Sequence, residues 1–396
     1  MGEGSVKKVK TAVIGCGMIS NIYIRNLSKL FSIIDLVALC DLNQEAAKQK
    51  AEQFGIPKVM TIDEVAASEE IELVINLTAP VAHYSVIKQM LEAGKHVYTE
   101  KMFTTDLEQS RELVALANAK GLMIAVAPDT VLGAGVQTAR KIIDSGMAGQ
   151  ISSGFVSVSR NQNLNSETFK FLQKSGGALP YDVGIYYVGA LIALLGSVKA
   201  VRGFGAPAFR HEKELLFDEG NAASWTIPGN NVLAAALEFE SGALVSLHFN
   251  GNAVGAERHT FELYGSEATL EIGDPDSFGG EVKMTLPESD TVTMPFTHGY
   301  NGSNMLPEKS PFAYYGNRGI GVAELAWAIR GGRGNRLSKE YGLHCQEVLQ
   351  GIDEAARTGE TYLVESRCEV RPLKSGFYSS TFNGGLRGDA ERSLVD

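Results

Sequence analysis

The spacing of apolar residues changes once along the 396-residue chain, near residue 128. Before that point, short runs of β-branched and other apolar residues alternate with segments of helical periodicity. The predicted strands are 9–14, 35–40, 73–77, 96–99 and 122–127. Strands that alternate with helices are typical of a mainly parallel sheet covered on both faces. Residues 1–128 are therefore predicted to form one α/β domain.

Helix-start signals stand between these strands. Ser, Thr, Asp and Asn favour the first position of a helix because their side chains accept hydrogen bonds from free backbone N–H groups. The signals are Asn43 before a helix that ends at Gly55, a T-x-x-E capping box at Thr61 and Glu64, Pro80 in a first turn, and a second box at Thr105 and Glu108. They predict the order β-α-β-α-β-α-β-α-β.

After one more predicted helix, at 132–145, strands follow one another directly. They are 151–160, 201–209, 231–239, 243–251, 260–264 and 268–272. Apolar and polar residues alternate in 244–250, so one face of an open, mainly antiparallel meander is buried. Helices at 319–329 and 338–356 complete a predicted α+β domain, residues 129–396. An open sheet face often pairs with a copy of itself, which predicts a homodimer or homotetramer.

A glycine-rich segment, residues 15–20 (GCGMIS), follows the first predicted strand and opens a helix. Gly15 permits a tight turn, Gly17 lets the backbone approach a pyrophosphate, and the helix start at Met18 and Ile19 attracts negative charge. Asp41 ends the second strand, where a carboxylate binds ribose hydroxyls and repels a 2′-phosphate. The segment predicts a doubly wound Rossmann domain that binds NAD. NADP, or a glycine-rich turn without nucleotide, are the alternatives.

Further candidate residues follow the third and fourth predicted strands. Thr78, Ala79 and His83 come after the third strand, and Glu100 and Lys101 end the fourth. Ligands of a parallel sheet bind at the carboxyl ends of its strands, so we expect these residues at the nicotinamide. For His83, hydrogen bonding to the backbone is an equally good interpretation.

Ordered motifs along nearly the whole chain resemble those of the Gfo/Idh/MocA oxidoreductases. After the glycine-rich loop, 78–83 (TAPVAH) is similar to T-P-x-x-x-H, 93–101 (AGKHVYTEK) to A-G-K-H-V-x-x-E-K-P, and 175–186 (SGGALPYDVGIY) to G-G-G-x-L-x-D-x-G-x-H. The resemblance implies that Lys101 transfers the proton and that Glu100 lies against the nicotinamide ribose. Burial and the positive nicotinamide ring both disfavour a charged lysine, so its amine can accept a hydroxyl proton.

The chain departs from the family pattern at two positions. Met102 stands where the family has Pro, and Tyr186 stands where it has His. Because a phenol is a poorer base than imidazole at neutral pH, Lys101 is expected to do more of the acid–base work, with Asp182 orienting the substrate or modulating the lysine. A helix-cap role for Asp182 and a packing role for Tyr186 stay open.

Composition narrows the partners. The net charge is −10 and no basic run is present, which argues against nucleic acid or an anionic membrane as a ligand. The apolar stretches are too short to span a bilayer, and the four widely spaced cysteines argue against zinc and fit a reducing cytoplasm. We expect no metal site. A polar cluster at 161–163 (NQN) and a glycine-flanked loop at 314–318 are plausible pocket walls.

Three functions are compatible with these features. The preferred one is a cytoplasmic NAD-dependent oxidoreductase acting on a secondary alcohol of a sugar, cyclitol or related polyol, a substrate class that the resemblance implies. An NAD-retaining lyase or glycosidase, which oxidises its substrate transiently, is the second. The third is a sensor that binds the nucleotide without catalysis.

Overall fold

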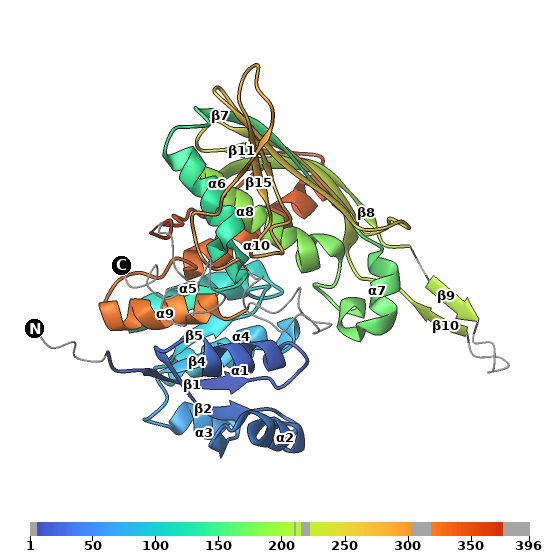
Figure 1. The fold of residues 1–396 in the computed structure, drawn as a ribbon. Coiled ribbons are helices and arrows are strands. Elements are labelled where there is room, and N and C mark those ends of the chain that lie inside the picture. Colours follow the sequence, from blue (N-terminus) through green and yellow to red (C-terminus); the bar gives the residue numbers. More distant parts are fainter. Residues whose placement is uncertain (1–5, 210, 215–221, 302–317, 375–396) are drawn as a thin grey trace, which may run out of the picture.

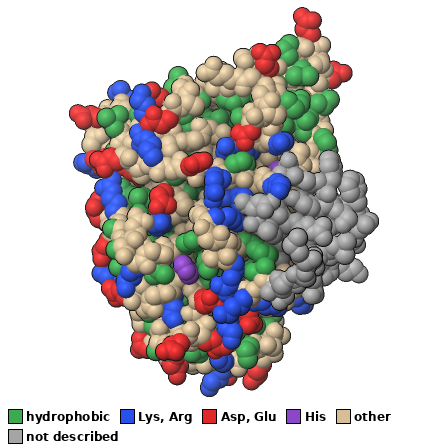
Figure 2. All heavy atoms as spheres, turned by 90° about the vertical axis from the view of Figure 1, so that its left-hand side faces the viewer, with side chains coloured by type: hydrophobic (Ala, Val, Ile, Leu, Met, Phe, Trp, Pro, Cys, Tyr) green, Lys and Arg blue, Asp and Glu red, His purple; other side chains and the backbone are tan. Residues whose placement is uncertain are grey.

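The computed structural model describes residues 6–209, 211–214, 222–301 and 318–374. Two sheets stand one above the other in Figure 1, with helices between them. No helix in these described ranges is long and apolar enough to cross a membrane. Acidic and basic side chains are interspersed over the face of the molecule that Figure 2 shows.

The first sheet has six parallel strands in the order β3-β2-β1-β4-β5-β6. Their bounds are β1 Val9–Ile14, β2 Ile34–Cys40, β3 Lys58–Val59, β4 Leu73–Asn76, β5 His96–Thr99 and β6 Ile124–Val126. The order reverses between β1 and β4, which is the Rossmann arrangement and places a ligand crevice at the carboxyl ends of these strands. The two-residue strand β3 is an addition to the predicted order, because it is too short to show a pattern.

Five helices connect these strands. They are α1 Ser20–Lys29, α2 Gln44–Phe54, α3 Ile62–Ala67, α4 Pro80–Glu92 and α5 Leu107–Lys120. The cap at Asn43 and the capping box of Thr61 and Glu64 are confirmed. The box predicted at Thr105 and Glu108 is wrong. Asp106 caps α5 instead, because its side chain accepts a hydrogen bond from the Gln109 N–H.

The second sheet has nine strands in the order β16-β15-β14-β13-β7-β12-β11-β8-β17. Their bounds are β7 Ile151–Ser159, β8 Val198–Pro207, β11 Asn230–Phe239, β12 Leu244–Asn250, β13 Arg258–Gly265, β14 Thr269–Ile272, β15 Val282–Thr285, β16 Val292–Met294 and β17 Tyr362–Leu363. The sheet is mainly antiparallel, but β7 lies between β12 and β13 and runs parallel to β12. A simple meander was therefore the wrong topology. A separate pair, β9 His211–Glu214 and β10 Ala222–Trp225, projects from the body in Figure 1.

Helices cover one face of the second sheet. They include α6 Ala134–Asp144, α8 Ile185–Leu195 and α10 Lys339–Thr358. Helix α9 Ile320–Gly331 contacts the first sheet instead. The short helices are η1 Asp129–Leu132, α7 Gln162–Thr168, η2 Lys170–Gln173 and η3 Pro180–Gly184. Helix α8 is apolar on all sides and is the central helix of this layer (Figure 1). Helix α9 contacts β5 and β6 of the first sheet, and α10 contacts β6 of the first sheet and β8 of the second. One buried apolar cluster extends through both halves. The division at residue 128 stays a prediction.

Candidate functional site

The glycine-rich turn lies at the carboxyl end of β1, and its two glycines serve different purposes. Gly15 has a φ of +103°, and a Cβ there would stand 2.6 Å from the carbonyl carbon of Leu77. Position 15 therefore excludes other residues on backbone grounds. A Cβ on Gly17 would meet no protein atom within 4 Å, and the neighbouring Met18 is 64% exposed. The open space beside Gly17 fits the close approach of a pyrophosphate.

Asp41 at the end of β2 is bonded to this turn. Its two carboxylate oxygens accept hydrogen bonds from the backbone N–H groups of Cys16, at 2.6 Å, and Asn43, at 2.8 Å. These bonds hold Asp41, the residue predicted to bind the ribose hydroxyls, in a fixed position beside the glycine-rich turn. Ile19 is partly buried against the core and anchors the start of α1.

Lys50 of α2 is a residue that sequence reasoning missed. Its Nζ donates hydrogen bonds to the carbonyl oxygen of Gly17, to Ser20 Oγ and to Asn21 Oδ1, at 2.8, 2.8 and 2.6 Å. The amine therefore ties the turn and the first residues of α1 to α2. A lysine in the middle of a polar helix carries no sequence signal for this role.

The segment after β4 is tied to the segment after β5 through His83. This side chain is fully buried, its Nδ1 lies 2.6 Å from the carbonyl oxygen of Met102, and its Nε2 lies 3.0 Å from that of Thr78. Burial lowers the pKa of His83. Of the two interpretations from the sequence, the structure shows the backbone contacts, and cofactor contact stays a prediction. Ala79 is exposed at the start of α4.

Glu100 is buried directly after β5. Its Oε1 accepts a hydrogen bond of 2.6 Å from the Tyr23 hydroxyl, and its Oε2 accepts one of 3.0 Å from the backbone N–H of Lys101. Tyr23 lies on α1, one turn after the glycine-rich segment. The carboxylate therefore fixes the backbone from which Lys101 projects. The peptide bond between Lys101 and Met102, the position where the resemblance has Pro, is cis.

Lys101 forms an ion pair with Asp182, which belongs to the part of the chain after residue 128. Its Nζ lies 2.7 Å from Asp182 Oδ1 and 2.6 Å from the Asp182 carbonyl oxygen, with side-chain exposures of 18% and 15%. Gln162 Nε2 donates to the other carboxylate oxygen at 2.9 Å. Burial alone would raise the pKa of Asp182, but Lys101 and Gln162 outweigh it and hold this pKa below its ordinary value.

Asp182 occupies a π-helical turn, η3, that runs into α8. Such turns interrupt the regular hydrogen-bond ladder and are frequent at functional sites. The Asp182 carbonyl and carboxylate consequently both accept from one lysine amine, which a helix-cap role alone would not require. Asp182 and Lys101, predicted from distant motifs, are brought together.

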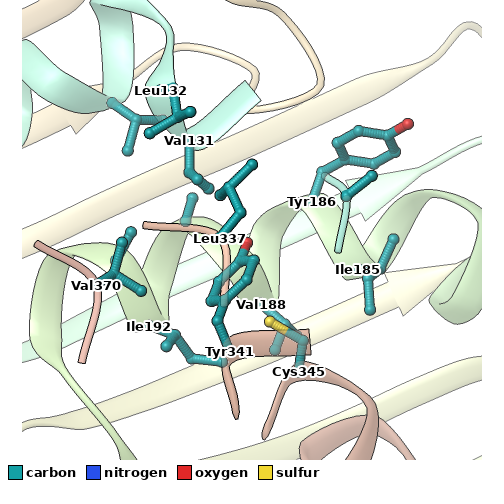
Figure 3. Close-up of a cluster of buried hydrophobic side chains, with 14 of the residues drawn as sticks. Val131, Leu132, Ile185, Tyr186, Val188, Ile192, Leu337, Tyr341, Cys345 and Val370 are labelled. Carbon is teal, nitrogen blue, oxygen red and sulfur yellow. The ribbon is translucent and has the colours of Figure 1, made fainter. Parts of the chain in front are cut away.

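Tyr186 follows on the first turn of α8. The Lys101 Nζ lies 5.5 Å from the centroid of its ring. Arg318, 5% exposed, also contacts this side chain, because its Nη2 donates to the Tyr186 hydroxyl at 2.7 Å and to Asp276 Oδ1 at 3.1 Å. Burial raises the pKa of Tyr186 well above its ordinary value, so the phenol keeps its proton. Its hydroxyl end points away from the other labelled side chains of the buried cluster in Figure 3.

Arg318 joins the two halves of the molecule. Its carbonyl oxygen accepts from Asn26 Nδ2 of α1 at 2.8 Å, and its Nη1 lies 3.6 Å from Asp129 Oδ1. The other Asp129 oxygen accepts from the N–H groups of Gly319 and Gly321, at the start of α9. The sequence indicated Arg318 only as part of a glycine-flanked loop. Tyr314, Tyr315 and Asn317 of that loop lie outside the described residues.

Of the polar cluster predicted at 161–163, Gln162 bonds to Asp182, whereas its two neighbours have other partners. Asn161 caps α7, and Asn163 Nδ2 donates to Asn252 Oδ1 at 3.2 Å. No group of three His, Cys, Asp or Glu side chains in the described ranges is arranged to hold a metal ion. A hollow of about 430 Å³ over β13 to β15 is lined by residues such as His259, Glu271 and Lys283, and it includes none of the predicted site residues.

Two family models match the chain. Residues 9–127 match the one described as "Oxidoreductase family, NAD-binding Rossmann fold", and residues 136–271 match "GFO/IDH/MocA C-terminal domain".

Individual proteins are also similar to this chain, either over about half of its length or over most of it at low sequence identity. An uncharacterized oxidoreductase of Schizosaccharomyces pombe is 32% identical over 196 residues, 49% of this chain and 53% of that protein, so the chain spans about half of that relative's length. A scyllo-inositol 2-dehydrogenase (NADP+) of Bacillus subtilis is 21% identical over 380 residues, 92% of this chain and 98% of that protein. The solved structure of levoglucosan dehydrogenase in complex with NADH has a TM-score of 0.76 at 18% identity, covering 91% of this chain and 100% of that one. At this identity the likeness shows the fold.

Proposed function

Because the chain belongs to the Gfo/Idh/MocA family, we propose that it is an NAD-dependent oxidoreductase acting on a CH–OH group of a sugar, cyclitol or related polyol. The observation that carries the proposal is the Lys101–Asp182 pair at the carboxyl end of β5. A lysine amine held by a carboxylate, at the sheet edge where a nicotinamide lies in this fold, is suited to acid–base work on a substrate hydroxyl.

The proton and the hydride leave the substrate by separate routes. Lys101 accepts the hydroxyl proton, and Asp182 stabilises the ammonium that forms, while Gln162 holds the carboxylate in place. When bound, NAD supplies the acceptor for the hydride that leaves the same carbon, so a secondary alcohol becomes a ketone and one proton is released to the lysine. In the reverse direction, Lys101 returns the proton to the new hydroxyl oxygen.

Two buried amide oxygens support a polyhydroxylated substrate. Gln162 Oε1 and Asn163 Oδ1 have no hydrogen-bond partner within the described part of the chain. Buried polar atoms are usually satisfied, so these two are suited to accept hydrogen bonds from ligand hydroxyls. The names of two similar proteins, an inositol dehydrogenase and levoglucosan dehydrogenase, also refer to compounds with several hydroxyl groups.

We propose NAD rather than NADP as the preferred cofactor. The carboxylate of Asp41 stands beside the glycine-rich turn, where it would accept from ribose hydroxyls and repel a 2′-phosphate. The name of the Bacillus relative, in contrast, specifies NADP+.

The test is a reaction of the purified protein with NAD or NADP and a panel of hexoses, pentoses and inositols, followed by absorbance of the reduced nicotinamide. We expect one NADH for each ketone formed. Turnover without net NADH would point instead to the lyase or glycosidase alternative. A wild-type protein that binds NAD but turns over no member of the panel, or a Lys101→Met variant with full activity, would contradict the proposal.

We also propose a homodimer or homotetramer that uses the outer face of the second sheet. Large apolar side chains on the adjacent strands β7 and β12, Phe155 and Leu244, and on β8, Phe204, are exposed. Exposed apolar groups on one sheet face are suited to pairing with a copy of the same chain. A solution mass of one chain, 42.5 kDa, by light scattering would refute it. A cytoplasmic location stays a prediction.

A further inference from the structure

Arg318 is a buried cation whose partners come from different parts of the chain. Its guanidinium contacts Asp276 and the Tyr186 hydroxyl, and it lies near Asp129. A buried arginine is stable only when its charge and its N–H groups are compensated, which the two carboxylates provide. Neither carboxylate needs the tyrosine for its own charge balance. The Arg318–Tyr186 bond is therefore an addition to the ion pairs.

The direction of this bond is fixed by chemistry. An arginine has donors and no acceptor, so the Tyr186 oxygen must accept. The phenol's own proton is then left for another acceptor. No side chain or carbonyl in the described ranges accepts that proton. Among these residues, the Tyr186 O–H can therefore donate to a ligand oxygen.

The Tyr186 side chain lies next to Lys101, the proposed base. Tyr186 lies close to Lys101, whose Nζ is 5.5 Å from the ring centroid, and four residues after Asp182. A substrate oxygen that contacts the Lys101 amine would also be within reach of a neighbouring phenol. Figure 3 shows the Tyr186 hydroxyl directed out of the apolar cluster on which its helix rests.

We propose that Arg318 is a positioning residue that turns the Tyr186 hydroxyl into a hydrogen-bond donor to the reacting oxygen of the substrate, with Asp276 holding Arg318 in place. This inference rests on the proposed function. As Lys101 takes the substrate proton and the hydride leaves the carbon, the Tyr186 O–H stabilises the negative charge that builds on the oxygen and keeps its own proton. In the reverse direction the same donor polarises the ketone. No additional oxidant or reductant is needed.

The test compares Tyr186→Phe, Arg318→Lys and the double variant. Lysine keeps the buried positive charge, which favours folding, but its single short amine cannot reproduce the fork that reaches both Asp276 and Tyr186. Tyr186→Phe should lower kcat roughly 100-fold, as expected for loss of a donor to a developing oxyanion, with KM changed less than about threefold. Arg318→Lys should lower kcat roughly tenfold in the wild-type background and have no further effect in the Tyr186→Phe background.

A matched control separates this role from a structural one. Arg336→Lys makes the same substitution at another buried arginine, which pairs with Glu324 far from Lys101 along the chain. It should lower the melting temperature as Arg318→Lys does but leave kcat unchanged. The NADH dissociation constant, measured by fluorescence, should stay the same in all variants.

The outcomes decide between the claims. Equal losses of kcat from Arg318→Lys in both backgrounds, or full activity of Tyr186→Phe, would overturn the positioning role while the proposed function stands. If Arg318→Lys fails to bind NADH or to fold, Asp276→Asn is read by the same two-background comparison. A wild-type protein inactive on every polyol would overturn the proposed function, and this inference with it.

Discussion

The glycine-rich turn and the Lys101 cluster are built in opposite ways. The turn is one continuous segment whose shape depends on the positive φ and the missing side chain of Gly15, while Gly17 leaves open space beside it. The cluster combines side chains that are far apart in the sequence: Lys101 pairs with Asp182, and Arg318 bonds to Tyr186. Local sequence therefore specifies the shape of the turn, whereas the Lys101–Asp182 pair depends on the docking of segments far apart in the sequence.

Lys101→Met is expected to have the largest effect on catalysis while leaving nucleotide binding almost unchanged. Removing the proposed base should lower kcat by roughly 10³-fold, within the range of general acid–base contributions. The NADH dissociation constant should change little, because Lys101 bonds to Asp182 and not to the turn. Steady-state kinetics and fluorescence titration measure the two quantities. A large loss of NADH binding would show that the regions are not separable.

The converse separation is expected from Gly15→Ala. The new Cβ would overlap the Leu77 backbone at a positive φ, so we expect roughly 2–3 kcal/mol lower stability and much weaker NADH binding. Gly17→Ala is the matched control, because its Cβ meets no protein atom. Its melting temperature should equal that of the wild type while its NADH affinity falls. Equal melting temperatures for both variants would contradict the strain argument.

Mild acid should lower the stability of the folded protein by protonating His344 of α10. Burial lowers the pKa of this side chain to about 4, and its Nε2 accepts from the Val198 N–H at 2.9 Å, which requires the neutral ring. The unfolded chain binds this proton near pH 6.5, so stability is fully present above that pH and falls as the pH drops toward 4.

The loss attributable to this group is at most about 3 kcal/mol between these pH values. Urea unfolding of wild type and His344→Gln at pH 7 and pH 4.5 measures it. The variant should be less stable at pH 7 but lose less on acidification. Equal losses in both proteins would assign the acid sensitivity to other groups.

The smallest effect is expected from Asp41→Asn. The amide keeps an acceptor oxygen for only one of the two N–H groups, those of Cys16 and Asn43, and removes the charge that disfavours a 2′-phosphate. We expect NADH to bind roughly tenfold more weakly relative to NADPH. Fluorescence titration with both nucleotides measures the ratio. An unchanged ratio would mean that Asp41 serves only to shape the turn.

Features written in a short stretch of sequence could be predicted. The order of helices and strands around the first sheet, the cap at Asn43 and the turn at Gly15 all depend on neighbouring residues. The predicted box at Thr105 failed because two adjacent polar residues compete for one cap, and only the folded turn decides for Asp106. The predicted meander was wrong for the second sheet because β7 pairs with β12, a segment about 90 residues further along the chain.

The same reason explains why two residues that the sequence indicated only as pocket walls could not be given their contacts. Gln162 and Arg318 are ordinary polar residues in loops or short helices until folding brings them to Asp182 and Tyr186. Their contacts are hydrogen bonds between segments far apart in the sequence, which no single-sequence pattern encodes. Lys101 and Asp182 were found because a family pattern was available for both. The predicted catalytic roles await the measurements above.

The return of α9 and α10 to the first sheet limits how this protein can be divided for expression. Asp129 holds the start of α9 by two backbone N–H groups, and α10 packs against α5 and β6. A fragment cut after β6 would leave that apolar surface bare to water and lose the helices that shield it. Because α10 also packs against β8 and α8, neither sheet can be expressed alone without exposing one apolar face of this helix.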